Sequence, residues 1–416
     1  MFRLSSPTVP RETVIRCALV GVGSVGQSLL RIIKQRAQVL REKHNIRYLF
    51  VLVSDSSGTL VSHHGLDVER ILALKTGTGF DSENFDDFDT TSKHPLSTYK
   101  VSLSRDKKAN VSDRDLSQIW FYPAGTSQTT AEIFLNDQIL PAETFRNNFI
   151  LFEATPVNHD GEPGLSTVKN AMERGAHIVL ANKGPIAVGF RELQQKAKAK
   201  RVNLLYGATV CGGLPVLNIG RYDLSMAQFT EIRGVFNSTS NFILCEMGAG
   251  RTYEAALKEA QRRGIAETDP TLDVNGSDTA SKLYILFSTV ISSHLSLSDV
   301  EKEGITEITK EKIEEAKAAG KVYKLVASAV KRDNQGGEEK REEEGDKWEL
   351  CVKVELLPKD DFLALCDGWQ MGVEFHSDLF GSMYHKVDER EPTPTAAAML
   401  RDALTICGNN NFSRRD

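Results

Sequence analysis

"VIRCALVGVGSVG", residues 14–26, joins an apolar run to a glycine-rich turn, and a helical pattern follows in "QSLLRIIKQ". Its glycines at 21, 23 and 26 have the spacing G-x-G-x-x-G, directly after a predicted strand and at the start of a predicted helix. In that context the first glycine allows a tight turn, the second lets a pyrophosphate approach the backbone, and the third lets helix and strand pack closely. The free N–H groups at the start of the helix would then face the phosphates.

The same order of apolar run, glycine and helical pattern recurs in the first half of the chain, at 48–58, 147–156, 165–187 and 202–213. Buried parallel strands that alternate with helices produce such a pattern. We therefore predict an α/β fold with a doubly wound parallel sheet. In this fold the phosphates of a dinucleotide would bind Gly21, Val22, Gly23, Ser24, Val25 and Gly26. The alternative is a glycine-rich turn in another doubly wound fold.

The second half of the chain, after about residue 206, has a different pattern. Four runs are typical of strands in a second, mixed sheet, at 229–237, 321–332, 347–358 and 371–385. Three helical runs, at 253–264, 279–292 and 310–320, would pack on that sheet. The sequence therefore predicts a second domain of α+β type.

Two polar stretches interrupt these patterns. Residues at about 76–147 are interpreted as a polar insertion on the α/β frame, with no function assigned. Residues 332–347 are charged and nearly free of apolar side chains, so we predict an exposed connection between two antiparallel strands.

A chain of 416 residues is too long for one core and indicates two or three domains. Its net charge of -5 gives no electrostatic reason to expect nucleic acid or an anionic membrane as a partner. The six cysteines lie mostly in apolar stretches and without metal-ligand spacing, which favours reduced thiols. No signal-peptide pattern and no apolar run of membrane-spanning length are found. We therefore predict a cytoplasmic protein.

The second predicted strand ends in "SDSSG", residues 54–58. An acidic residue at this place, here Asp55, usually accepts hydrogen bonds from the ribose 2′-hydroxyl of NAD. Ser56 and Ser57 would instead suit the 2′-phosphate of NADP, so both cofactors stay open. A third interpretation is that the segment is only a turn.

"AETDPTLDVNGSDTASK", residues 266–282, contains four carboxylates and one lysine just before an apolar helical run. Ser277 or Asp278 is expected to cap a helix that continues from about Thr279. On this helix Asp278 and Lys282 are at i and i+4 and project from one face. Such a pair is usually a solvated salt bridge, but here the helix beyond it is apolar almost all round and is predicted to be buried.

A different interpretation of this pair follows if the glycine loop binds a nicotinamide cofactor. A carbonyl that is reduced by hydride needs a proton donor at its oxygen, and a desolvated lysine held by an aspartate can move that proton. The remaining carboxylates would hold a cationic group of the substrate, and an amino-acid ammonium is the obvious candidate.

The chain resembles homoserine dehydrogenases over most of its length. The motifs that carry the resemblance are "GVGSVG", "SDSSG", "ATP" ahead of "ANKGPIA", "ATVCGGLPVL", "GVFNSTSNFIL", residues 254–283 and "PTPTAAAML", in the order of the family. The resemblance implies NAD(P)-dependent interconversion of L-aspartate 4-semialdehyde and L-homoserine, in threonine and methionine biosynthesis, by a homodimer. It also implies a Rossmann domain of residues 1–205 with 386–416, and a substrate-binding and dimerisation domain of residues 206–385.

The resemblance also implies roles for individual residues. Lys282 matches the lysine that donates and accepts the proton at the substrate oxygen, and Asp278 matches its catalytic neighbour, which also binds substrate. Glu267 and Asp273 match the pair that holds the amino-acid end of the substrate. Lys183 matches a lysine near both substrate and cofactor, and Thr155 matches a contact to the nicotinamide end of the cofactor.

The sequence departs from the family in three places. Gly207 stands where the family commonly has a glutamate that helps to bind sodium, so a cation would be left with the backbone carbonyls of Val210, Gly212 and Leu214. A glycine-rich loop before the last helix is replaced by "YHKVDEREPTPTA", so residues 385–392 differ. Cys211 stands in place of a small glycine.

Two competing hypotheses remain at this stage. The first is a catalytically weakened paralogue that binds nucleotide and has a regulatory role, motivated by Gly207 and the altered loop. The second is a dehydrogenase for another small amino-acid aldehyde or alcohol. The presence of Glu267, Asp273, Asp278 and Lys282 together favours an active homoserine dehydrogenase.

Overall fold

The computed structural model describes residues 12–76, 99–100, 119–123, 129–145, 148–291, 294–332 and 347–409. The chain forms two compact units. Unit 1 contains the chain up to Pro185, Arg191–Tyr206 and the segment from Thr395, and unit 2 contains Ile186–Phe190 and Gly207–Pro394. Unit 2 extends beyond the predicted end at residue 385, because the last strand of its sheet, β14 (Gly381–Asp388), runs across that boundary.

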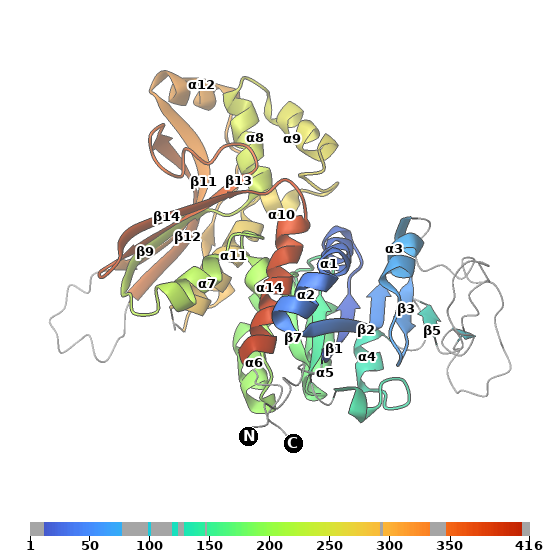
Figure 1. Ribbon diagram of the computed structural model, residues 1–416. Helices are drawn as coiled ribbons and strands as arrows, with labels where there is room; N and C mark the ends of the chain where they lie inside the picture. Colours follow the sequence, from blue (N-terminus) through green and yellow to red (C-terminus); the bar gives the residue numbers. More distant parts are fainter. Residues whose placement is uncertain are drawn as a thin grey trace, which may run out of the picture. The chain divides into compact units, whose positions relative to one another are not determined.

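Unit 1 is built on a sheet of mostly parallel strands (Figure 1). Its parallel part has the order β2-β1-β6-β7-β8, with β1 Thr13–Val20, β2 Ile46–Asp55, β6 Phe149–Glu153, β7 His177–Leu180 and β8 Leu204–Leu205. The chain moves from β1 outward to β2 and then returns to the other side of β1 with β6. Ligands of doubly wound sheets bind outside the carboxyl ends of the strands at such a reversal. The predicted Rossmann-type fold is confirmed.

Antiparallel strands extend this sheet beyond β2. They are β3 Gly58–Val61, β5 Trp120–Pro123 and β4 Tyr99–Lys100. The described parts of the stretch predicted as an insertion at about 76–147 thus add β4 and β5, followed by α4 Thr130–Leu135 and the 3-10 turn η3 Ala142–Phe145. The rest of that stretch lies outside the described residues.

The helices of unit 1 cover strands that are buried along most of their length, because both faces of a parallel sheet are enclosed. They are α1 Ser24–Gln35, α2 Ala37–His44, α3 Val68–Thr76, α5 Gly164–Glu173, α6 Gly184–Lys200 and α14 Thr393–Asn409. The helical segment after the glycine turn is divided into α1 and α2, since Arg36 leaves the helical conformation at φ -100° and ψ 11°.

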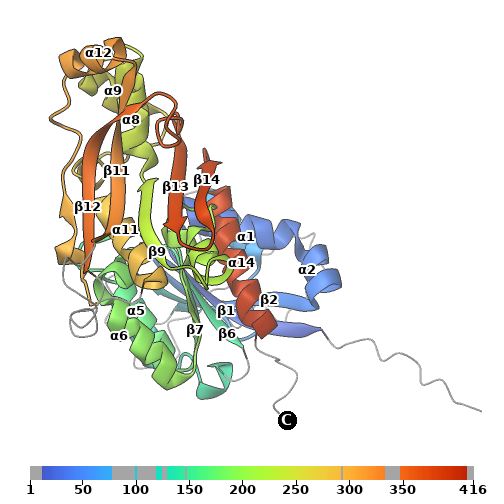
Figure 2. The ribbon, with the colours of Figure 1, turned by 90° about the vertical axis from the view of Figure 1, so that its left-hand side faces the viewer.

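Unit 2 contains a six-stranded mixed sheet of order β10-β12-β11-β9-β13-β14. Five of its strands lie side by side in Figure 2 and are antiparallel, and β10 pairs with β12 in parallel. The remaining strands are β9 Phe229–Val235, β10 Glu301–Lys302, β11 Lys321–Arg332, β12 Lys347–Pro358 and β13 Gln370–Ser377. The predicted mixed sheet is confirmed. Arg332 and Lys347 face each other in the ladder, so the segment between them joins two antiparallel strands as predicted; residues 333–346 themselves lie outside the described residues.

The helices of unit 2 include the one that carries the predicted acid–base pair. They are α7 Val216–Asn218, α8 Ser238–Gly248, α9 Tyr253–Arg262, α10 Thr271–Val274, α11 Ser277–Val290 and α12 Lys310–Ala318. α11 packs on β11 and β12, and Phe287 meets Trp348 with ring centroids 5.4 Å apart. Leu283–Phe287 are all buried, as the apolar run predicted.

Candidate active site

The glycine turn after β1 has the geometry of a phosphate-binding loop. Gly21 has φ +96°, and a Cβ built on it would lie 2.3 Å from the carbonyl carbon of Ala154. A Cβ on Gly26 would lie 2.1 Å from the carbonyl oxygen of Gly21. At Gly23, by contrast, no atom of the described residues lies within 4 Å of such a Cβ. Two glycines therefore permit close packing, and the middle one leaves open space beside the start of α1, where a pyrophosphate would fit.

Thr155 and Lys183 follow the neighbouring parallel strands β6 and β7. The Thr155 N–H donates to Glu153 Oε1 at 3.0 Å, and Asn182 Nδ2 donates to Thr155 Oγ1 at 3.0 Å. Asn182 Oδ1 accepts the N–H of Gly184, the first residue of α6, at 2.8 Å. These bonds hold the two turns that carry Thr155 and Lys183 against each other at the carboxyl edge of the sheet.

Asp55 lies at the end of β2, as predicted, but its carboxylate already has protein partners. Its Oδ1 accepts the Ser57 N–H at 2.8 Å, and its Oδ2 forms an ion pair with Lys75 Nζ at 2.5 Å. The side chains of Asp55 and Lys75 are 5% and 17% exposed. A ribose at this place would therefore meet a carboxylate whose charge is balanced by a lysine.

The predicted pair on α11 forms in unit 2. Lys282 Nζ lies 2.8 Å from Asp278 Oδ2 and also donates to the carbonyl oxygen of Phe236 at 2.8 Å. Asn237 Nδ2 donates to both Asp278 Oδ2, at 2.8 Å, and Asp273 Oδ1, at 2.6 Å. The Asn237 amide thus joins two carboxylates, and one of them, Asp278, also holds the Lys282 ammonium. The pair is mostly buried, with 16% of the lysine side chain and 7% of the aspartate side chain exposed, so it is not a solvated surface bridge.

Lys282 is held as an ammonium by this environment. Burial alone would lower its pKa, but the charge of Asp278 and the hydrogen bond to it, assisted by the charge of Asp273, outweigh burial and raise the pKa. A buried ammonium with a fixed direction is a suitable proton donor to an oxygen placed beside it.

α11 begins differently from our prediction. The helix starts at Ser277, and its N-cap is Gly276, at φ +81°, rather than Ser277 or Asp278. Asp278 does not cap because its carboxylate binds Asn237 and Lys282. Gly276 is required at this place, since a Cβ there would lie 2.5 Å from the carbonyl oxygen of Glu303.

The other carboxylates of residues 266–282 divide into two kinds. Asp269 Oδ1 accepts the Thr271 N–H at 3.1 Å and the Thr271 hydroxyl at 2.5 Å, so it organises the start of α10. Glu267 is exposed on a loop whose backbone is held by Gln261, through hydrogen bonds to the carbonyls of Glu267 and Thr268. The structure thus brings Asp273, Asp278 and Lys282 together and leaves the Glu267 side chain exposed.

Comparison with known proteins gives a consistent result. The homoserine dehydrogenase family profile matches residues 215–404. A homoserine dehydrogenase of Sulfurisphaera tokodaii is 37% identical over 233 residues, which is 55% of this chain and 68% of that protein. This chain belongs to the homoserine dehydrogenase family. An NAD(+)-dependent homoserine dehydrogenase of Pseudomonas canavaninivorans is 29% identical over 95% of this chain and 96% of its own length. The crystal structure of a putative homoserine dehydrogenase from Archaeoglobus fulgidus has a TM-score of 0.69 and 26% identity, and it covers 94% of this chain and 99% of that one.

The loop before α14, which we expected to differ from the family, brings a carboxylate to the turn after Gly207. Glu389 Oε2 accepts the Gly213 N–H at 2.9 Å, and a Cβ on Gly212 would lie 2.2 Å from the same oxygen. Among the described residues no group of three or more His, Cys, Asp or Glu suits a metal ion. A sodium ion at the carbonyls of Val210, Gly212 and Leu214 therefore stays a prediction, and the carboxylate that the sequence lacked at position 207 reaches the turn from position 389.

Sequence reasoning missed Asn237, which binds two of the predicted carboxylates in unit 2, and Lys75, which pairs with Asp55 in unit 1. Asn237 comes directly before α8, where its Oδ1 caps the helix by accepting the Ser240 N–H at 2.7 Å. An asparagine before a helical run predicts only that cap. Lys75, at the end of α3, belongs to no motif and was passed over.

Within the part of the chain that the structure describes, no helix is both long and apolar enough to cross a bilayer.

Proposed function

We propose that the chain catalyses the NAD(P)-dependent interconversion of L-aspartate 4-semialdehyde and L-homoserine. The observation that carries the proposal is the buried Lys282–Asp278 pair, joined through Asn237 to Asp273. The open space at Gly23 beside the start of α1 supports a dinucleotide in unit 1.

The side chains of this protein would move a proton at the substrate oxygen and hold the substrate beside the nicotinamide. A nicotinamide held beside the turn of Gly21, Gly23 and Gly26 would supply the hydride in reduction and accept it in oxidation. Lys282 would donate a proton to the C4 oxygen in reduction and accept it in oxidation, while Asp278 and the Phe236 carbonyl keep Nζ in place. Asp273 and Glu267 would hold the ammonium group of the amino acid. Lys183 would contact substrate and cofactor, and Thr155 the nicotinamide end.

The test is a spectrophotometric assay with L-homoserine and either NAD or NADP. Lys282→Ala should lose nearly all turnover and keep the affinity for the cofactor, because the lysine acts on the substrate oxygen. Lys310→Ala is the matched control, since Lys310 forms an exposed i, i+4 pair with Glu314 in the same unit, at 3.7 Å. If Lys282→Ala keeps most of its turnover at unchanged substrate affinity, the assignment is wrong.

The choice between NAD and NADP is proposed to depend on Asp55 and Lys75. Asp55 would accept a hydrogen bond from a ribose 2′-hydroxyl, and Lys75, together with Ser56, which follows Asp55 in the chain, would bind a 2′-phosphate. The ion pair between them supports the use of both cofactors, because neither charge faces the ribose alone.

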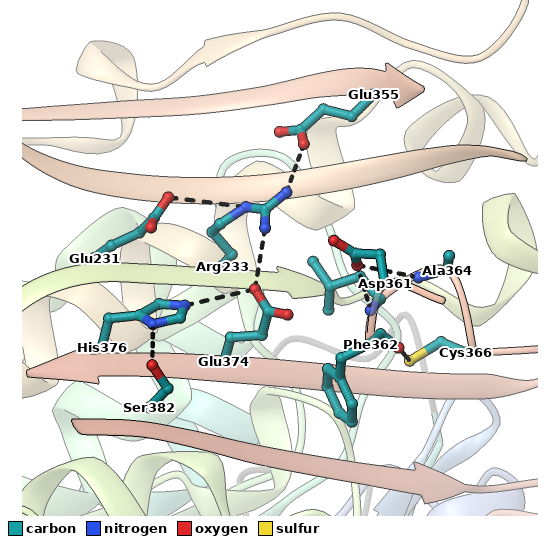
Figure 3. Close-up of polar contacts among 11 residues, drawn as sticks. Glu231, Arg233, Glu355, Asp361, Phe362, Ala364, Cys366, Glu374, His376 and Ser382 are labelled. Carbon is teal, nitrogen blue, oxygen red and sulfur yellow. Dashed lines mark hydrogen bonds and ion pairs between the residues drawn. The ribbon is translucent and has the colours of Figure 1, made fainter. Parts of the chain in front are cut away.

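We propose that the protein is a homodimer that pairs through one face of the unit 2 sheet. Arg233 on this face binds Glu355 at 2.7 Å and Glu374 at 3.1 Å, as Figure 3 shows. Trp348, which meets α11, is seven residues before Glu355 on β12, so the two point to opposite faces. The face with Arg233 is thus the one turned away from α11.

Light scattering in solution tests the dimer. Tyr384 lies opposite Glu374 in the ladder and is 51% exposed. Tyr384→Asp should give a monomer, whereas Tyr222→Asp, at a tyrosine of unit 2 that is 53% exposed, should remain a dimer. A monomeric wild type would refute the proposal.

We also propose a reducing, cytoplasmic location, which the six free cysteines support.

A further inference from the structure

Glu153, the last residue of β6, carries a carboxyl group that no role above uses. It is completely buried. Its Oε1 accepts hydrogen bonds from the Thr155 N–H at 3.0 Å, from the Thr155 hydroxyl, and from Asn182 Nδ2 at 3.5 Å. Its Oε2 is buried and has no hydrogen-bond partner among the described residues. A buried carboxyl with all of its donors on one oxygen is costly unless it is neutral or has a specific task.

The bonds of Glu153 continue into the next turn of the sheet edge. Asn182 donates to Thr155 Oγ1 at 3.0 Å and to the carbonyl oxygen of Pro156 at 3.4 Å, and it accepts from the Gly184 N–H. Glu153, Thr155 and Asn182 therefore connect the end of β6 to the start of α6, on either side of Lys183. The backbone of Gly164 packs closely against the side chains of Glu153 and Asn182 and limits their movement. A Cβ on Gly164 would lie 3.2 Å from Glu153 Oε1 and 3.1 Å from Asn182 Nδ2.

The environment of the carboxyl group favours its protonated form. Burial raises the pKa of Glu153 to about 7, and the hydrogen bonds from Thr155 and Asn182 only partly oppose this effect. Since Oε1 receives all three donors, the proton of the neutral form is on Oε2. Below this pKa the carboxyl holds Thr155 without adding a negative charge at this edge of the sheet.

We propose that Glu153 is a positioning residue for the nicotinamide end of the cofactor, acting through Thr155 and Asn182. The inference rests on the proposed function, because it takes Thr155 as a contact of the nicotinamide. Without the acceptor at Oε1, Thr155 would lose two hydrogen bonds that fix both its backbone and its hydroxyl, and Asn182 would lose one partner.

Three variants of the full chain test this proposal. Glu153→Leu fills a similar space and removes the acceptor, so the Kd for NAD or NADP, measured by nucleotide fluorescence, should rise about tenfold or more. Glu153→Gln keeps a neutral acceptor oxygen, so its Kd should stay within about twofold of wild type even if its thermal midpoint falls, because its buried NH2 group lacks a partner. Ile178→Ala is the matched control, since it makes a cavity at a fully buried residue of β7 and should lower stability without changing Kd.

The outcomes separate this proposal from the proposed function. If the wild type oxidises homoserine and Glu153→Leu binds cofactor as tightly as the wild type, the role of Glu153 is refuted while the function stands. If Glu153→Leu and Ile178→Ala weaken Kd equally, Glu153 is only a structural residue and the proposal is also overturned. If the wild type binds dinucleotide without oxidising homoserine, the function fails, and the Kd series still decides about Glu153. A wild type that binds neither cofactor refutes both.

Discussion

The stability of unit 1 should depend on pH through Glu153. Its pKa is raised from 4.5 to about 7 because the carboxyl is buried. Between these two values the folded state keeps a proton that the unfolded state has lost. The free energy of unfolding therefore falls as pH rises through this window, and the contribution of the group is fully present only below the unfolded pKa.

The size of the effect follows from the same two values. A pKa that rises from 4.5 to about 7 corresponds to about 3 kcal/mol, at about 1.4 kcal/mol for each tenfold change in the equilibrium constant. Glu153 is fully buried, so screening by solvent does not reduce this figure. The slope should be steepest between pH 4.5 and 7 and vanish above the folded pKa, where both states are ionised.

Urea unfolding of wild type and Glu153→Gln, followed by circular dichroism, measures this dependence. Glutamine does not titrate, and the other ionisable groups contribute equally to both proteins, so the difference between the two free energies isolates Glu153. We expect the wild type to lose about 3 kcal/mol relative to the variant between pH 4.5 and about pH 8. Two curves that run parallel through this range would show that the carboxyl is not held neutral, and the reasoning from its burial would fail.

Three further predictions concern other residues. Burial lowers the pKa of His177 to about 4, and its Nδ1 accepts the Asn203 N–H at 2.9 Å. The free energy of unfolding of the wild type should therefore rise by about 3 kcal/mol relative to that of His177→Gln as pH increases from 4 to 6.5. A slope of the opposite sign in urea unfolding would contradict this. Asn237→Ala should reduce kcat/KM for homoserine about tenfold or more at unchanged cofactor Kd, because two carboxylates lose their shared donor, and the lost helix cap should cost about 1 kcal/mol. Lys75→Ala should weaken NADP binding about tenfold more than NAD binding, and equal losses would place Lys75 away from the 2′-phosphate.

Local patterns explain what could be predicted about the site. Gly21, Gly23 and Gly26 were predicted from the spacing of one turn between a strand and a helix, although the close contact of Gly21 is with Ala154, far away in the chain. The i, i+4 spacing of Asp278 and Lys282 places them one helical turn apart wherever the helix lies. The predicted N-cap of α11 was wrong because the Asp278 carboxylate binds Asn237, which lies outside that helix.

Long-range contacts explain what was missed. Asn237 reaches carboxylates 36 and 41 residues later in the chain, and nothing near it in the sequence indicates either contact. Glu389 meets Gly213 across 176 residues, and Lys75 meets Asp55 across 20. Each pairing requires that two segments separate in the sequence come together, which depends on the tertiary packing of the chain.

The sequence by itself determined the fold class, the glycine turn after β1, the family and the pairing of Asp278 with Lys282, because each depends on the periodicity or spacing of residues within one or two elements. Only the tertiary structure decided the charge state of these groups. The surroundings in space raise the pKa of Glu153, which favours its neutral form, and raise the pKa of Lys282, which keeps it charged. Burial and the distance between opposite charges determine a pKa, and both are properties of the packed chain.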